Sequence, residues 1–405
     1  MDYKLLITNY ENRIVSALYD EKRPVQILAD PVEERTLRIG GIYIGRISNI
    51  VKNLNAAFVE ICPGVMGYLA LDGALSPIVK QTHADGKLHT GDEVIVQIER
   101  EEIKTKVAAL TVNFNLTGKY LVLVHGKPII GVSAKITNPQ KRKGLKELLE
   151  TQTDGESYGF IVRTNAQDAS PDEILHEVEE LKKRYQKITE NGLYRTAFSV
   201  LEGPLPAYLC SLRDINAAML GQILTDDKKL YAQIKDYLEE YQPVDAAKLM
   251  LYQDEFPMRK RYSLKERIEE ALHTKVWLKS GASIIIEPTE ALTVIDVNTG
   301  KAVKGGARGD EFFLKINLEA AAEIAYQIRL RNLSGIIMVD FIDLESEEAN
   351  EKLLAGMREL LAKDPVKAVV VDMTMLHLVE ITRKKVRRPL HEEFAVNSDR
   401  RNKPC

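Results

Sequence analysis

Two apolar segments in the last third of the chain each end in an aspartate, and this pattern constrains the fold more than any other feature. Asp296 closes one run and Asp340 closes the other. Helical periodicity follows them over residues 318–329 and 346–362. Strands that alternate with helices predict an α/β unit. In an open sheet of that kind, ligands bind at the carboxyl ends of the strands.

Two acids that end neighbouring strands could hold one hard divalent cation. Mg²⁺ takes one or two carboxylates and keeps several waters, which leaves room for a phosphate. Asn298 lies two residues beyond Asp296, so in a continuing strand its side chain points to the same face. Spacing also allows plain helix caps or surface ion pairs, and it does not rank Asp343 and Asp372 below the other two acids.

The first quarter of the chain has a different pattern, which is typical of short strands without helices. Residues 1–30 alternate apolar and polar positions, which predicts a small strand meander. Over residues 40–98, short strands follow one another between Gly, Pro and Asn turns. That spacing predicts a small barrel of the OB type.

Phe58, Tyr68 and Lys106 are the candidates in this barrel for binding a single strand, because such binders combine exposed aromatic rings with cations. Ala57 and Val59 flank Phe58, so the pattern alone favours a core position for Phe58. Tyr68 is the better candidate for exposure, and Lys106 fits a solvated face equally well.

A mixed region separates the barrel from the α/β unit. Residues 171–189 have helical periodicity, and residues 211–241 are helix-rich and charged. Arg163 and Thr164 end an expected strand, where a guanidinium and a hydroxyl could grip a phosphate or form only a surface turn. Residues 383–388 carry five positive charges, which suits either a phosphate-contacting patch or a solvated helix end.

Composition excludes several classes of protein. Hydrophobic residues make up 45 % and charged residues 28 %, which is incompatible with a largely disordered chain. No apolar run approaches the ~18–20 residues that span a bilayer. The absence of a signal-peptide pattern and of a CxxC pair among three cysteines favours the reducing cytoplasm. A net charge of −3 argues against a uniformly basic coat but permits a local basic groove.

Taken in order, these segments resemble the ribonuclease E/G family over roughly residues 1–390. No single motif is decisive, but many occur in register. They are residues 41–47, 56–59, 67–69, 108–111, 120–123, 161–164, 290–298, 317–321, 324–325, 327–331, 339–343 and 380–383.

The resemblance implies an α+β multidomain architecture. A ribonuclease H-like domain (residues 1–36 and 208–271) would carry an inserted OB-fold RNA-binding barrel (37–112). A 5′-sensor region (113–207), a C-terminal deoxyribonuclease I-like α/β catalytic domain (272–389) and a disordered tail (390–405) complete the expected organisation.

The resemblance also implies a Mg²⁺-dependent endoribonuclease that cuts single-stranded, A/U-rich RNA and leaves 5′-phosphate and 3′-hydroxyl ends. It would prefer 5′-monophosphorylated RNA and act on rRNA precursors and mRNA. The family's Mg²⁺ ligands match Asp296 and Asp340, and its assisting asparagine matches Asn298. Its RNA-gripping positions match Phe58, Tyr68 and Lys106, with Tyr68 in place of the usual phenylalanine. Its 5′-phosphate pocket matches Gly118, Val122, Arg163 and Thr164.

Two departures from the family pattern concern assembly and the 5′ end. Bacterial members commonly form a homodimer through a CPxC motif that binds Zn²⁺, whereas this chain ends in Pro404-Cys405 and does not support that zinc link. Near the sensor, where the family often has an arginine pair and a later basic residue, this chain has Ala134-Lys135 and Met375. The alternatives are a non-catalytic RNA-binding protein of the same fold and an enzyme that acts on DNA.

Overall fold

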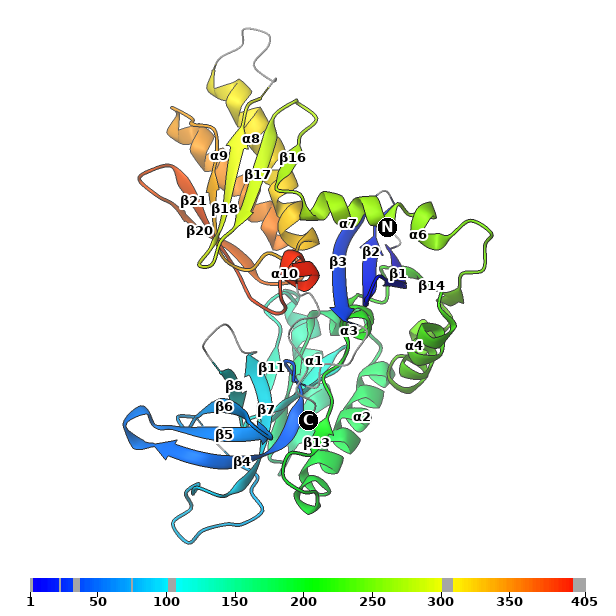
Figure 1. The fold of residues 1–405 in the computed structure, drawn as a ribbon, viewed down its shortest axis with the longest axis vertical. Helices are drawn as coiled ribbons and strands as arrows, with labels where there is room; N and C mark the ends of the chain where they lie inside the picture. Colours follow the sequence, from blue (N-terminus) through cyan, green and yellow to red (C-terminus); the bar gives the residue numbers. More distant parts are fainter. Residues whose placement is uncertain are drawn as a thin grey trace. The chain divides into compact units, whose positions relative to one another are not determined.

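The computed structural model describes residues 3–21, 23–31, 37–73, 76–100, 107–300 and 309–395. Over these residues the chain forms two compact units (Figure 1). The first contains the N-terminal strands, residues 222–230 and the chain from residue 250 onward, and the second contains residues 31–221 and 231–249. Within the described ranges, no helix is long and apolar enough to cross a membrane.

A six-stranded sheet forms the centre of the first unit. Its strands, in spatial order, are β16 (Lys275–Trp277), β17 (Ser283–Pro288), β18 (Thr293–Asn298), β19 (Gly335–Asp340), β21 (Leu378–Arg383) and β20 (Ala368–Met373). Strands β18 and β19 are parallel, and the other neighbours are antiparallel. The strands expected in this region are therefore present, and β16 and β21 are additions.

Helices α8 (Asp310–Leu330) and α9 (Glu347–Ala362) cover one face of this sheet (Figure 1). Helix α8 begins eight residues before the periodicity predicted, and the carboxylate of Asp310 accepts hydrogen bonds from the backbone N–H groups that precede α9. Along β19, Ile337 packs into the core, whereas Ile336 is 50 % exposed. One face of the sheet is thus left open, and this face carries the acids.

A five-stranded sheet completes the first unit, in the order β15 (Leu249–Leu251), β14 (Leu220–Thr225), β1 (Tyr3–Tyr10), β2 (Arg13–Tyr19) and β3 (Pro24–Pro31). The meander expected at the N-terminus is confirmed. Strand β14 was not expected, because it lies between the helices α3 (Ala207–Asp214) and α4 (Lys228–Tyr241) in a charged segment. The short helices α5 (Pro243–Ala246), α6 (Met258–Arg261) and α7 (Leu264–Leu272) follow α4 in sequence.

The predicted disorder from residue 390 is wrong for the first six residues of the tail. Leu390–Ala395 form helix α10, and the Leu390 side chain is buried. The guanidinium of Arg13 donates hydrogen bonds to the carbonyl oxygens of Glu393 and Phe394, which anchors the helix. Residues 396–405, including Cys405 and the expected half of a zinc motif, lie outside the described residues.

The second unit contains the expected barrel. Strands β4 (Ile42–Val51), β5 (Ala56–Cys62), β6 (Val65–Ala70), β8 (Ala108–Thr111) and β7 (Glu93–Arg100) pair in that order, and β4 also pairs with β7. This last pairing closes the sheet into a five-stranded barrel, consistent with an OB-like domain. Strand β13 (Val200–Glu202) adds to the outer edge of β4.

A four-stranded sheet forms the rest of this unit, in the order β11 (Ile130–Val132), β12 (Tyr158–Val162), β10 (Leu121–His125) and β9 (Asn115–Thr117). Helices α1 (Pro139–Thr153) and α2 (Pro171–Thr189) contribute to its core. The bounds of α2 are those predicted. Ser170 and Glu173 form a reciprocal capping box that fixes its first turn.

The basic run over residues 383–388 is not a uniform surface patch. Arg383 is 3 % exposed, and its Nε donates to Asp364 at 2.8 Å. Its Nη1 donates to Asn332 and to the Leu333 carbonyl oxygen, both at 2.9 Å. This arginine is therefore a structural residue of the sheet.

Replacing Arg383 with methionine is expected to lower the free energy of unfolding by about 3–5 kcal/mol, because it leaves the Asp364 carboxylate buried without its main cation. Urea unfolding followed by circular dichroism measures the change. The matched control is Arg261→Met, which removes an exposed ion pair to Asp254 and should cost less than about 1 kcal/mol. Equal losses in the two variants would contradict the structural role.

Candidate active site and phosphate pocket

The two strand-ending acids lie side by side. Asp296 on β18 and Asp340 on β19 are register partners in the parallel pairing, and neighbouring strands lie ~4.8 Å apart. Both side chains belong to the open face of the sheet, since Ile295 and Val339 next to them are fully buried on the helix-covered side. The prediction that these acids come from neighbouring strands is confirmed.

Negative charge is concentrated at this edge of the sheet. Partial desolvation, together with the negative charges of Asp296 and Asp343, raises the pKa of Asp340 above its ordinary value. Among the described residues, no group of three or more histidine, cysteine or acidic side chains is placed to hold a metal ion. Two adjacent carboxylates with mutual repulsion fit a cation that needs few protein ligands and keeps its waters, as Mg²⁺ does.

Asn298 is tied to the first acid. Its Nδ2 donates a hydrogen bond to Oδ2 of Asp296, as expected for two side chains on the same face of β18. Asn298 is exposed and Asp296 is half-buried. The amide is therefore held beside the carboxylate at the open end of the strand.

The structure also distinguishes the two remaining acidic candidates by their distance from the pair of acids. Asp343 lies in the segment after β19, close enough to influence the Asp340 carboxyl group. Asp372 lies on β20, opposite Glu380, and β21 separates that strand from β19. Asp372 is thus not part of the pair of acids at the strand ends.

The two aromatic candidates of the barrel form a cross-strand pair. Phe58 on β5 lies opposite Tyr68 on β6, with ring centroids 6.1 Å apart in an edge-to-face arrangement. Both are half-buried, so the core position that the pattern favoured for Phe58 is wrong. Ala57 and Val59 point inward, and the alternation of a strand turns Phe58 outward. Lys106 lies outside the described residues.

The four predicted pocket residues come together where β12 ends. Val122 on β10 pairs with Ile161 on β12, and Arg163 follows that strand. Nη1 of Arg163 donates to the carbonyl oxygen of Gly118 at 2.5 Å. Oγ1 of Thr164 lies 3.0 Å from the hydroxyl oxygen of Ser133. The guanidinium thus sits at the turn that joins β9 to β10, and the hydroxyl lies beside the residue that follows β11.

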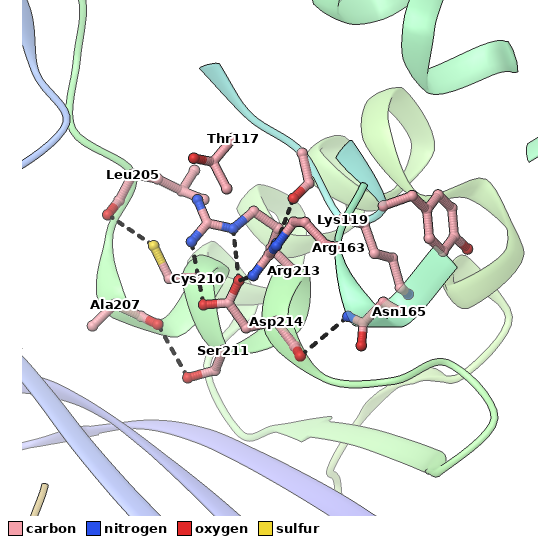
Figure 2. Close-up of polar contacts among 12 residues, drawn as sticks. Thr117, Lys119, Arg163, Asn165, Leu205, Ala207, Cys210, Ser211, Arg213 and Asp214 are labelled. Atoms are coloured by element: carbon pink, nitrogen blue, oxygen red, sulfur yellow. Dashed lines mark hydrogen bonds and ion pairs between the residues drawn. The ribbon is translucent and has the colours of Figure 1, made fainter. Parts of the chain in front are cut away.

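A second arginine and an aspartate join this group (Figure 2). Nη2 of Arg163 donates to Asp214 at 2.8 Å, and Nε of Arg213 donates to the same oxygen at 2.9 Å. Loss of solvent around the carboxyl group would raise the pKa of Asp214, but the positive charges of Arg213 and Arg163 outweigh it and lower the pKa to about 2. Nδ2 of Asn165 donates to the Asp214 backbone carbonyl oxygen at 3.2 Å.

Sequence reasoning missed Arg213 and Asp214. An Arg-Asp dipeptide at the end of a helix indicates an ion pair within the dipeptide at the surface. The contact of Asp214 with Arg163 joins residues that are 51 positions apart in the sequence. No local signal in the sequence points to this contact.

Glu177 of α2 holds the turn between β9 and β10 through hydrogen bonds. Its buried carboxylate accepts hydrogen bonds from the backbone N–H groups of Lys119, Tyr120 and Leu121 at 2.7–2.9 Å. A Cβ atom at Gly118 would lie 2.3 Å from Oε1 of Glu177. Glycine is therefore required at this position by close approach.

Comparisons with known proteins identify relatives of this chain. The profile of the ribonuclease E/G family matches residues 115–386. The ribonuclease G of Haemophilus influenzae is 34 % identical over 364 residues, which cover 87 % of this chain and 73 % of that protein. The ribonuclease G of Escherichia coli is 33 % identical over 368 residues, with 88 % and 75 % coverage. The ribonuclease E of H. influenzae is 30 % identical over 400 residues, which cover 97 % of this chain and 42 % of that protein.

A family profile that spans most of the chain, and two ribonuclease G relatives that align over about three quarters of their own length, establish the relationship. The chain belongs to the ribonuclease E/G family.

Gly118→Ala is expected to lower the free energy of unfolding by about 1–3 kcal/mol, because the new methyl group overlaps the Glu177 carboxylate. Urea unfolding measures this change in the free energy of unfolding. The matched control is Gly144→Ala in α1, where a Cβ atom meets nothing within 4 Å and a helix gains about 0.5–1 kcal/mol. A Gly118 variant as stable as the wild type would show that the turn tolerates a side chain.

Proposed function

We propose that this chain, an endoribonuclease by its family, uses Mg²⁺ to hydrolyse phosphodiester bonds of single-stranded RNA and prefers RNA with a 5′-monophosphate. The single observation that carries the catalytic part is the register pairing of Asp296 with Asp340 on the open face of the sheet, with Asn298 hydrogen-bonded beside them. Processing of rRNA precursors and turnover of mRNA are the roles proposed by resemblance.

Asp296 and Asp340 would hold the metal ion. When bound, Mg²⁺ polarises a phosphoryl oxygen and lowers the pKa of a coordinated water. Asn298 would donate its amide N–H to a non-bridging oxygen of the scissile phosphate and fix that group at the strand ends. Water then adds to phosphorus and the 3′ oxygen leaves, which gives a 5′-phosphate and a 3′-hydroxyl.

The pocket at the end of β12 supports the preference for a 5′-monophosphate. A guanidinium binds a phosphate through two parallel N–H donors, and Arg163 already directs two of its nitrogens at oxygen acceptors. The Thr164 hydroxyl adds a further donor. We also propose that Phe58 and Tyr68 stack on bases of the bound strand, as paired aromatics of OB-like barrels do.

A homodimer remains part of the proposal, by resemblance to the family.

Asp340→Asn is expected to lower kcat/KM for a labelled, A/U-rich, 5′-monophosphorylated RNA by more than about 100-fold, because the variant loses a metal ligand. EDTA should abolish cleavage by the wild type, and RNA binding should persist in both cases. Gel analysis of the products measures cleavage, and fluorescence anisotropy measures binding.

The matched control for that experiment is Asp372→Asn. It makes the same substitution on the same sheet, outside the pair of acids. Binding without cleavage by the wild type with Mg²⁺ would contradict the proposed chemistry and favour a purely RNA-binding role. A duplex DNA substrate distinguishes RNA from DNA as the target.

Arg163→Ala is expected to remove roughly 10- to 100-fold of the preference for 5′-monophosphorylated over 5′-hydroxyl RNA, as loss of a charge-assisted hydrogen bond predicts. Cleavage of the 5′-hydroxyl substrate should change little. Competition between the two substrates in one reaction measures the ratio, with the exposed Arg195→Ala as control. An unchanged ratio in the Arg163 variant would remove the pocket from 5′-end recognition.

A further inference from the structure

An exposed tryptophan lies on the same open face as the acids. Trp277, the only tryptophan in the chain, is 60 % exposed at the end of β16. Its neighbour Val276 packs against the core, so the alternation of the strand turns Trp277 to the open face. Figure 1 shows β16 at one edge of the sheet, beside β17. The large indole ring contributes little to the core and needs another explanation.

A cation accompanies the ring. Nζ of Lys275 lies 4.2 Å from the centroid of the Trp277 ring, within the range of a cation–π contact. Lys275 is itself exposed. Residue Trp277 is 60 % exposed with Lys275 in place, so surface of this residue remains open to a nucleobase. An open aromatic ring beside a cation is the combination with which proteins bind single strands.

The strand register connects this pair to the acids. Trp277 lies opposite Ser283, and Ser283 lies opposite Asn298. Side chains of opposed residues point to the same face, so Trp277 and Asn298 belong to one row, roughly 10 Å apart at two strand spacings. The middle residue of the row, Ser283, has a small side chain and is buried.

The adjacent row leads to the metal ligands. Lys275 lies opposite Ile285, and Ile285 lies opposite Asp296. Asp340 continues this row on β19. An RNA strand that crosses the open face would therefore meet the cation and the aromatic ring on one side of the two acids.

We propose that Trp277 stacks on a base of single-stranded RNA next to the scissile phosphate, while Lys275 contacts the neighbouring backbone phosphate. This pair fixes the strand over Asp296 and Asp340 and makes Trp277 a positioning residue of the catalytic sheet. The proposal rests on the proposed function, because it takes RNA as the occupant of the open face. The polar groups of the two rows support RNA as the occupant, since the Lys275 cation complements a phosphate and the Asn298 amide can donate a hydrogen bond to one.

The single tryptophan makes the contact directly observable. A short, A/U-rich, 5′-monophosphorylated RNA is titrated into the wild type in EDTA, which prevents cleavage, and tryptophan fluorescence is recorded. Stacking should quench the emission, with the same midpoint that anisotropy of a labelled copy of the RNA gives. Unchanged emission at RNA concentrations where anisotropy is saturated would overturn the proposal.

Variants test the consequence for catalysis. Trp277→Ala should lower kcat/KM for single-stranded RNA roughly 5- to 100-fold, the range expected for one base stack. Trp277→Phe should retain most of the activity, because a phenyl ring still stacks. Tyr194→Ala, which removes a 90 % exposed aromatic ring elsewhere, should match the wild type. Equal kcat/KM for Trp277→Ala and the wild type would overturn the positioning role.

The outcomes separate this proposal from the proposed function. If the wild type cleaves RNA with Mg²⁺ but Trp277 does not respond, only the inference about Trp277 fails. If the wild type neither binds nor cleaves RNA, the proposed function fails first. A tryptophan emission that shifts with protein concentration, and not with RNA, would assign the face to a second copy of the chain and would also overturn the proposal.

Discussion

The parallel pairing of β18 with β19 sets Asp296 directly beside Asp340, and the chemistry of the open face depends on this register. Side chains alternate along a strand, so a slip of one residue would turn one acid toward the helices. The buried residues Ile295 and Val339 fix the register, since they must remain against α8 and α9. Hydrophobic burial on one face thus places two like charges together on the other, where the divalent cation of the proposed function would relieve their repulsion.

The pocket of the second unit is also organised by charge, but there two arginines surround one carboxylate. Arg163 and Arg213 converge on one carboxylate, that of Asp214, and together they hold its pKa at about 2. A phosphate monoester carries about −1.5 to −2 charge near neutral pH, more than a carboxylate. In the proposed function a 5′-phosphate would therefore compete with Asp214 for Arg163, and without RNA the carboxylate would keep the guanidinium oriented.

Local features of the sequence allowed much of the fold to be predicted. Apolar runs that end in acids indicated β18 and β19, and Pro171 with helical periodicity indicated α2 at its observed bounds. Contacts between residues that are far apart in the sequence could not be predicted in this way. The contact of Arg163 with Asp214 spans 51 positions. Helix α10 is only six residues long, and it is held by contacts of Leu390 and Phe394 with the core and by hydrogen bonds from Arg13, far away in the sequence. Phe58 is only half-buried because side chains alternate along β5, and its apolar neighbours hid this alternation in the sequence.

The most direct test of the paired acids is metal binding itself, measured without RNA. Mn²⁺, a paramagnetic substitute for Mg²⁺, is titrated into the wild type and into an Asp296→Asn, Asp340→Asn double variant, and free Mn²⁺ is counted by electron paramagnetic resonance. The register pairing predicts a Mn²⁺ ion bound per wild-type chain, displaced by Mg²⁺ and lost in the double variant. Equal Mn²⁺ binding by the two proteins would contradict the assignment of these carboxylates as the metal ligands.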